Sequence, residues 1–236
     1  MKVAIMQPYF LPYIGYFQLI NCVDKFIIYD NIQYTKKGWI NRNRFLQNGK
    51  DEKFSIPIKK ASDYLDVCER EISSDFKKEK LLGQLKNSYL KAPYFAQAYP
   101  LIENIVRCEE TNLFKYIYKS VISICHYFNI ETEVIVSSQI SIDASLKCQD
   151  RVISMCKAIN TDTYINAIGG LDLYSPTKFR ENNLGLKFLK TKDFEYRQYN
   201  NEFIPWLSIV DVIMFNSKET VSEFLMNGFD LIEGAK

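Results

Sequence analysis

Short apolar runs and longer apolar stripes alternate along the chain, and this pattern predicts strands separated by helices. Brief apolar or alternating runs are typical of strands, whereas apolar positions three or four residues apart are typical of helices. Strands are expected at residues 2–6, 26–29, 53–58, 133–137, 162–166 and 185–190. Helices are expected from Pro12 to about residue 21, and at 76–90, 98–108, 112–128, 146–159, 175–182, 206–215 and 219–227.

The order of these elements indicates the fold class. Strands that alternate with helices favour an α/β fold with a Rossmann-like, mostly parallel sheet and helices on both faces. Residues 75–128 carry helical patterns and no strand signal, so we expect a helical insertion there. Two C-terminal helices are expected to follow the sixth strand. A chain of 236 residues can form one large domain, and we expect a single α/β domain over 1–236.

Composition and charge exclude several classes of protein. Hydrophobic residues make up 47% of the chain and charged residues 25%, as in a globular protein. A net charge of +2 gives no support for a broad nucleic-acid surface. No apolar run approaches the roughly 20 residues that span a bilayer. The first apolar stretch ends at Gln7-Pro8, unlike a signal peptide, so we expect a cytoplasmic protein.

The cysteines and the single histidine do not form a metal-binding pattern. The six cysteines are scattered without a Cys-x-x-Cys pair, and we expect them to be reduced. His126 follows Cys125 in an apolar helical pattern, which favours a structural role for it. We therefore predict no metal site, and the sequence identifies no cofactor.

Polar and aromatic residues gather where the first predicted strand ends. Gln7, Tyr9 and Tyr13 lie in this segment, in a turn that contains Pro8 and Pro12. In open parallel sheets the carboxyl ends of the strands form the ligand crevice. We expect the three side chains to line such a crevice. A tight turn without a ligand is the alternative.

A denser polar cluster follows the second predicted strand. Its candidate residues are Asp30, Gln33, Tyr34, Lys37, Trp39, Asn41, Arg42 and Arg44. Basic side chains bind phosphate oxygens, amides bind hydroxyls and tryptophan offers a stacking face, so the cluster suits a phosphate-bearing ligand with a sugar or base. Asp30 is a candidate general base. A surface loop is the alternative interpretation.

A third candidate segment follows the fifth predicted strand and is expected to form the opposite wall of the crevice. Its candidate residues are Asn166, Gly169, Gly170 and Tyr174. Paired glycines allow a ligand to approach the backbone closely, and their N–H groups can hold an anion. The spacing matches neither a dinucleotide-binding fingerprint nor a Walker loop, and a simple turn also uses glycine.

Several short motifs lie in these segments and beside them. They are Gln7-Pro8-Tyr9, Leu11-Pro12, Gly15-Tyr16-Phe17, Asp24, Asp30, Gln33-Tyr34, Trp39, Asn41-Arg42-Asn43, Tyr164-Ile165-Asn166, Gly169-Gly170 and Leu173-Tyr174. Together they resemble the WbqC-like proteins of bacterial surface-polysaccharide (O-antigen) gene clusters, and the resemblance covers nearly the whole chain. Many members of that family place a histidine before the Gln-Pro pair, where this sequence has Met6.

The resemblance implies a role in making modified amino sugars for lipopolysaccharide. The expected step is transfer of an acyl or aminoacyl group from a donor to the amino group of a nucleotide-linked sugar. In that reading Lys37, Arg42 and Arg44 hold the diphosphate, and Trp39 or Tyr34 stacks on base or sugar. Asp30 and Gln7 are then the catalytic candidates.

Two other functions remain open at this point. The layout of the first strands is also similar to nucleotidylyltransferase-like enzymes, so an ATP-dependent ligase or adenylyltransferase of the same pathway is the first alternative. A non-catalytic subunit that binds a sugar nucleotide is the second. The sequence leaves the donor, the sugar and the oligomeric state open, with a homo-oligomer as one outcome.

Overall fold

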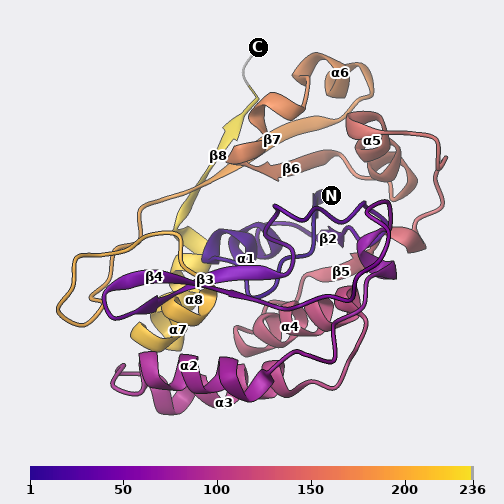
Figure 1. Cartoon of the computed structure of the whole chain (residues 1–236). Helices are drawn as coiled ribbons and strands as arrows, with labels where there is room; N and C mark the ends of the chain where they lie inside the picture. The colour runs from indigo at the N-terminus through magenta and orange to yellow at the C-terminus, as the bar shows by residue number, and fades with distance from the viewer. Residues whose placement is uncertain (235–236) are drawn as a thin grey trace.

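A six-stranded sheet in the order β5-β2-β1-β6-β7-β8 forms the centre of the fold (Figure 1). The structure is a computed structural model that describes residues 1–234. The strands are β1 (Lys2–Met6), β2 (Lys25–Ile28), β5 (Glu133–Val136), β6 (Thr163–Ala167), β7 (Gly185–Thr191) and β8 (Phe229–Glu233). All neighbouring pairs are parallel except β7 with β8. The predicted Rossmann-like, mostly parallel sheet is confirmed.

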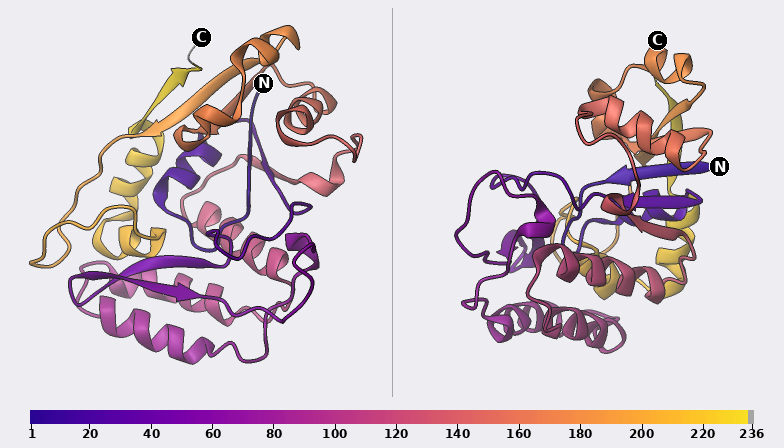
Figure 2. Two further views of the ribbon diagram at one scale, coloured as in Figure 1. Left: turned by 45° about the horizontal axis from the view of Figure 1, so that its top comes forward. Right: turned by 90° about the vertical axis from the view of Figure 1, so that its right-hand side faces the viewer.

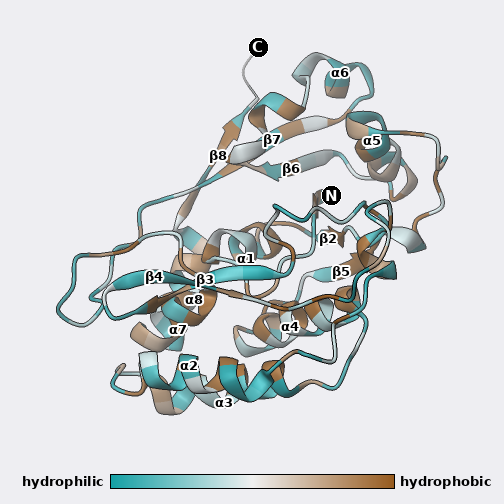
Figure 3. Cartoon of the chain, viewed as in Figure 1, coloured by the Kyte–Doolittle hydropathy of each residue, from teal (hydrophilic) through white to brown (hydrophobic). Residues whose placement is uncertain are grey.

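Helices cover both faces of this sheet (Figure 2). One face carries α1 (Ile14–Asn21), α4 (Leu113–Tyr127), α7 (Ile209–Phe215) and α8 (Lys218–Asn227), and the other carries α5 (Cys148–Ala158) and α6 (Pro176–Glu181). Successive strand residues point to opposite faces, so Ala4 packs with the first group of helices and Val3 with the second. Burial on both faces explains the apolar runs of β1 and β2. Figure 3 shows that β5 and β6 also contain hydrophilic residues, drawn in teal.

A separate antiparallel hairpin lies beside the sheet. It consists of β3 (Arg42–Gln47) and β4 (Lys50–Ser55). Its turn places Asn48 at φ 52° and Gly49 at φ 72°, as a type I′ hairpin turn requires. The strand predicted at 53–58 therefore belongs to this hairpin and ends at Ser55. No strand was predicted at β3, which begins with Arg42 at the end of the polar cluster and has the polar residue Asn43 among its buried positions.

The segment between the hairpin and β5 contains the predicted run of helices. The helices are α2 (Lys78–Tyr89), α3 (Phe95–Arg107) and α4. Within this segment α2 packs on β3 and α3, and α3 packs on α7 (Figure 1). Leu85 of α2 and Ile102 of α3 belong to the same buried cluster as Ala4 of the sheet. None of the helices described over residues 1–234 is long and apolar enough to cross a membrane.

The last element within residues 1–234 is the strand β8, whereas two helices were predicted to close the fold. β8 pairs antiparallel with β7 at the edge of the sheet, where it leaves most of its side chains exposed. Asp230 and Glu233 at its ends interrupt the apolar pattern, so no strand was predicted there.

The sheet has a topological switch point at β1, because the strands that follow β1 in the sequence lie on both sides of it. The chain first moves from β1 to β2 on one side and later places β6 and β7 on the other. Open α/β sheets bind ligands at such a switch point, outside the carboxyl ends of the strands. The register pairs Met6 with Ile28 and Ile28 with Val136, so the residues that follow these strands meet at one edge.

Candidate functional site

An aromatic pocket of about 250 Å³ lies beside the turn that follows β1. It is lined by Tyr9, Pro12, Tyr13, Trp39, Asn43, Arg44 and Trp206. The side chains come from three segments that are far apart in the sequence: this turn, the start of β3 with the residues before it, and the loop before α7. The ring centres of Tyr13 and Trp206 are 5.6 Å apart, and the Arg44 guanidinium lies 5.7 Å from the centre of the Trp39 ring.

Hydrogen bonds from the start of α7 hold these three segments together. The Ser208 N–H donates to the Arg44 carbonyl at 2.9 Å, and the Ser208 hydroxyl donates to the Leu11 carbonyl at 2.6 Å. The Ile209 N–H donates to the Pro12 carbonyl at 2.8 Å. Because these groups are buried, the bonds fix the pocket walls relative to the sheet.

Both tryptophans of the pocket leave much of their ring in contact with solvent. Trp39 is 44% exposed and Trp206 is 60% exposed, which is unusual for such large apolar side chains. Trp206 also has a positive φ of 62°, and Leu11 in the opposing turn has a φ of 45°. Backbone strain of this kind in bulky residues is concentrated at binding sites. The combination indicates a surface that binds a flat or ring-shaped ligand.

The tyrosines of the pocket remain neutral hydrogen-bonding groups. Burial raises the pKa of Tyr9, with a smaller contribution from Tyr13, and burial also raises the pKa of Tyr13. The Tyr9 hydroxyl donates to the Gln7 side-chain oxygen at 3.3 Å, and the Tyr16 hydroxyl donates to the Gln7 carbonyl at 3.0 Å. The structure therefore brings the predicted Gln7, Tyr9 and Tyr13 together.

The three basic residues predicted to hold a diphosphate lie in different environments. Arg44 lines the pocket, where it donates to Asp51 at 2.9 Å and to the Trp206 carbonyl at 3.1 Å. The Arg42 guanidinium instead donates to the Lys36 carbonyl. Lys37 is exposed. Arg44 is thus the member of this group that the structure brings to the pocket.

Three other predicted ligand residues make contacts that hold the loop after β2. The Tyr34 hydroxyl donates to the Asn41 side chain at 2.9 Å, and the Asn41 amide donates to the Ile56 carbonyl at 2.7 Å. The Gln33 amide donates to the Asp63 carbonyl at 2.9 Å. Tyr34 and Asn41 are buried. These hydrogen bonds give Gln33, Tyr34 and Asn41 a role in the structure of the loop.

Asp30 is directed toward the edge strand β5. It is 5% exposed, and its Oδ1 accepts hydrogen bonds from the Ser137 hydroxyl at 2.8 Å and from the Ser138 N–H at 2.9 Å. It thereby caps the short 3₁₀ helix η2 (Ser137–Gln139). Asp30 is not among the residues described as lining the aromatic pocket. This geometry gives Asp30 a structural role, and its catalytic role stays a prediction.

The residues predicted to form the opposite wall lie at the end of β6 and directly after it, and none of them lines the aromatic pocket. Asn166 is buried and accepts the Ala167 N–H at 2.7 Å. A Cβ atom at Gly170 would lie 2.8 Å from the Asn166 amide nitrogen, so a larger residue there would displace this side chain, whereas Gly169 faces open space. Tyr174 accepts a hydrogen bond from the Tyr164 hydroxyl at 3.1 Å.

An arginine that the sequence analysis did not select packs on a tyrosine at the end of β2. The Arg151 guanidinium stacks on the Tyr29 ring, 5.1 Å from its centre. Burial raises the pKa of Tyr29, and the Arg151 charge opposes that rise. The helix dipole disfavours a cation in the first turns of a helix. Arg151 is the fourth residue of α5, where a cation is unfavourable. Its position near the start of a predicted helix could therefore have marked it as a candidate functional residue.

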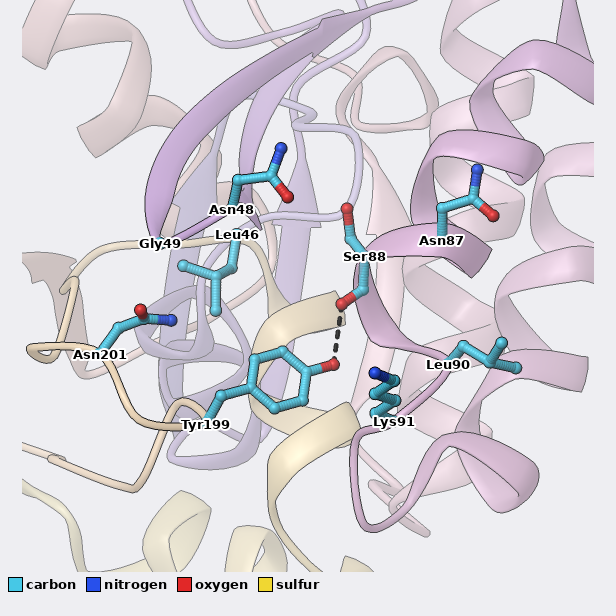
Figure 4. Close-up of a pocket in the computed structure, with 9 residues that line it drawn as sticks. All are labelled: Leu46, Asn48, Gly49, Asn87, Ser88, Leu90, Lys91, Tyr199 and Asn201. Carbon is cyan, nitrogen blue, oxygen red and sulfur yellow. Dashed lines mark hydrogen bonds between the residues drawn. The ribbon is translucent and has the colours of Figure 1, made fainter.

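Two further cavities lie away from the switch point. One of about 330 Å³ is rich in amides from Asn48, Asn87 and Asn201, and the Tyr199 hydroxyl donates to the Ser88 carbonyl at 2.8 Å in its wall (Figure 4). The other, of about 470 Å³, lies between α3 and α4 and includes His126. Residues 1–234 contain no group of three or more His, Cys, Asp or Glu that could hold a metal ion.

Together these features define a Rossmann-like α/β protein with an aromatic pocket next to its switch point. The chain belongs to the WbqC-like protein family, whose sequence profile matches residues 7–223. It is also 28% identical over 227 residues to the uncharacterized protein Rv1507c of Mycobacterium tuberculosis (strain ATCC 25618 / H37Rv), a match that covers 95% of this chain and 97% of the relative. The comparison with solved structures gave no significant match.

Proposed function

We propose that this protein is a transferase that forms an amide on the amino group of a nucleotide-linked amino sugar in bacterial surface-polysaccharide biosynthesis. The observation that carries the proposal is the aromatic pocket. Trp39 and Trp206 present exposed ring faces, which suit the apolar face of a sugar or a base. The hydroxyls of Tyr9 and Tyr13 beside them suit the polar groups of the same ligand.

The charge at the pocket supports an anionic ligand. Arg44 lies on the wall with its guanidinium next to the Trp39 ring. Its ion pair with Asp51 is partly exposed, so exchanging this carboxylate for a phosphate oxygen costs little. The guanidinium of an arginine can bind two phosphate oxygens at once. Arg44 would thus hold the diphosphate while the sugar stacks on a tryptophan ring.

Amide formation requires a neutral amine that attacks the acyl carbonyl, after which the leaving group departs and the nitrogen loses a proton. Gln7 lies at the end of β1, next to Tyr9. A carboxamide cannot take up the proton, but it can orient the amine or the acyl oxygen through hydrogen bonds. Asp30 is the candidate base, and an Asp30→Asn variant with unchanged turnover would exclude it.

A mass-spectrometric assay tests the reaction. Purified protein is incubated with a nucleotide-linked amino sugar and a panel of acyl and aminoacyl donors, and the sugar is expected to gain the mass of the acyl group. Failure of every donor to give a product would refute the transferase assignment.

The tryptophan substitutions test the pocket. Loss of one stacking face costs about 1–3 kcal/mol. Trp39→Ala and Trp206→Ala should therefore each raise the KM for the sugar nucleotide by about tenfold or more. Tyr64→Ala is the control, because Tyr64 is a large exposed aromatic residue outside the pocket. Equal KM values in all three variants and the parent would place the sugar nucleotide elsewhere.

The second candidate is an ATP-dependent ligase or adenylyltransferase. The observation that favours it is the parallel strand order with a switch point at β1, an arrangement that often binds nucleotides. The same assay separates the two functions. A ligase requires ATP and releases pyrophosphate or ADP, whereas a simple transferase gives product without ATP.

A further inference from the structure

Arg151 is a partly buried cation without a charged partner among residues 1–234. Its Nε atom is buried and makes no hydrogen bond there, and none of the described ion pairs includes its guanidinium. It stacks on the Tyr29 ring at 5.1 Å from the ring centre. A guanidinium stacked by its face keeps its N–H edge free to bind an acceptor.

Three carboxylates of the neighbouring segments have other partners. The Asp66 carboxylate takes part in a capping box with Glu69 at η1 (Val67–Glu69). Burial raises the pKa of Asp66 and Arg151 partly opposes this, so the two charges interact at a distance without a direct ion pair. Asp150 pairs with Lys178 at 2.6 Å, and Asp30 accepts its bonds from the segment after β5. Arg151 is thus not neutralised by direct contact.

Two tyrosines lie on the side of the sheet that carries this arginine. Tyr29 and Tyr174 pack against the same buried cluster, and Tyr174 contributes to the raised pKa of Tyr29. Tyr174 accepts its hydrogen bond from Tyr164, so its own proton remains available for donation. Burial raises the pKa of Tyr174 and of Tyr29, which keeps both hydroxyls protonated.

The position of this group relates it to the aromatic pocket. Tyr29 follows β2, and its N–H donates to the Met6 carbonyl at 2.9 Å, directly before Gln7. Tyr29 and Tyr174 pack on the side of the sheet that carries α5, whereas Tyr9 and Tyr13 pack on the side that carries α1. The two groups therefore flank the same carboxyl edge of the sheet from its two faces.

We propose that Arg151, Tyr29 and Tyr174 form a binding site for a substrate oxyanion, either a phosphate or a carboxylate. The site is distinct from Lys37, Arg42 and Arg44. Only the identity of the anion depends on the proposed function. In that function the anion is either the diphosphate of the sugar nucleotide or the carboxylate of an acyl donor.

Alkylation of Cys148 gives a local test that needs no turnover. Cys148 is exposed and lies three residues before Arg151, and it contributes to the raised pKa values of Tyr29 and Tyr174. The rate of its modification by iodoacetamide is measured by peptide mass spectrometry at constant ionic strength, with sodium pyrophosphate or sodium acetate as probe. We expect one of the two anions to slow the reaction in a saturable manner. Protection by pyrophosphate indicates the diphosphate, and protection by acetate indicates the carboxylate.

Substitutions assign the protection to the arginine. Arg151→Gln should weaken the apparent affinity for the anion by at least about tenfold, as expected for the loss of a charged hydrogen-bonding group. Arg151→Lys keeps the charge without the planar fork, so it should weaken the affinity less, and it serves if the glutamine variant does not fold. Lys147→Gln is the matched control, because Lys147 is an exposed cation at the start of the same helix.

Two results would overturn the proposal. One is the absence of protection by either anion in the unmodified protein. The other is equal protection in the parent and in the Arg151 variants. A transferase assay without product does not affect this test, and a failed protection test leaves the transferase assay standing.

Discussion

At the scale of single residues, Asp211 of α7 is a buried carboxylate that ties distant segments together. It accepts hydrogen bonds from the Tyr89 hydroxyl at 2.8 Å, the Tyr196 hydroxyl at 2.6 Å and the Gln198 amide at 2.7 Å. Burial raises the pKa of Asp211 to about 6, although these three donors oppose the rise. The loop that carries Tyr196 and Gln198 also carries Trp206, so this carboxylate helps to hold the aromatic pocket.

The raised pKa of Asp211 predicts a pH-dependent stability. The pKa in the folded protein is about 6, above the ordinary value of 3.8, so the folded state binds this proton more tightly than the unfolded state. The contribution of Asp211 to stability is therefore greatest at low pH and falls as the pH rises through about 4 to 6. The fall amounts to about 3 kcal/mol.

Denaturant unfolding between pH 4 and pH 7 measures this effect. Relative to the parent, Asp211→Asn should lose less stability over this range, because the variant has no proton to release at this position. Asp172→Asn is the control, because Asp172 is an exposed aspartate. Parallel pH profiles of the parent and Asp211→Asn would contradict the assignment.

At the scale of elements, two glycines have opposite effects on the stability of the elements that contain them. Gly49 lies in the hairpin turn at φ 72°, and a Cβ atom there would lie 2.9 Å from the Asn201 side chain. Gly83 lies inside α2, and a Cβ atom there would meet nothing within 4 Å. The first position requires glycine because of its backbone, whereas the second only lowers the helix propensity.

These two glycines predict stability changes of opposite sign. Gly49→Ala should destabilise the protein by about 1–2 kcal/mol, because the left-handed conformation is unfavourable for alanine. Gly83→Ala should stabilise it by about 0.5–1 kcal/mol. Thermal or denaturant unfolding of both variants measures the two changes. A stabilising Gly49→Ala would show that the turn adopts another conformation.

The success of sequence-based prediction differed between elements for a physical reason. The central strands β1 and β2 were predicted because both of their faces are buried, so each one is a nearly uninterrupted apolar run. β3 was missed because its inward residues include Asn43, which is satisfied by the Leu11 carbonyl at 2.7 Å. β8 was missed because an edge strand exposes most of its side chains. Polar strands of this kind become recognisable only with their partners in place.

At the scale of the whole molecule, the aromatic pocket depends on contacts between residues that are far apart in the sequence. Tyr9, Tyr13, Trp39 and Arg44 were predicted from strand-end positions, and they do line one pocket. Trp206 could not be assigned to it, because nothing local in the sequence links that loop to the turn after β1. The link is made by Ser208 of α7 and the backbone of the turn.

This link predicts a difference between two helix-capping serines. Ser208 caps α7 and donates to the Leu11 carbonyl, whereas Ser217 caps α8 at an exposed position. Ser208→Ala and Ser217→Ala should each cost about 1 kcal/mol or more of stability. Ser208→Ala alone should also weaken binding of the sugar nucleotide, because the Trp206 wall loses an anchor. Calorimetric titration of both variants measures the difference, and equal affinities would show that the wall does not depend on this bond.

The aromatic pocket has a spectroscopic consequence. The chain contains 2 tryptophans, and both of them line this pocket. The entire tryptophan emission of the protein therefore originates at the proposed ligand site. Its intensity and wavelength should change when a ring stacks against a bound molecule or when water leaves the ring faces. Unlabelled nucleotide sugars, acyl donors and their fragments can thus be ranked by simple fluorescence titration, before the reaction itself is reconstituted.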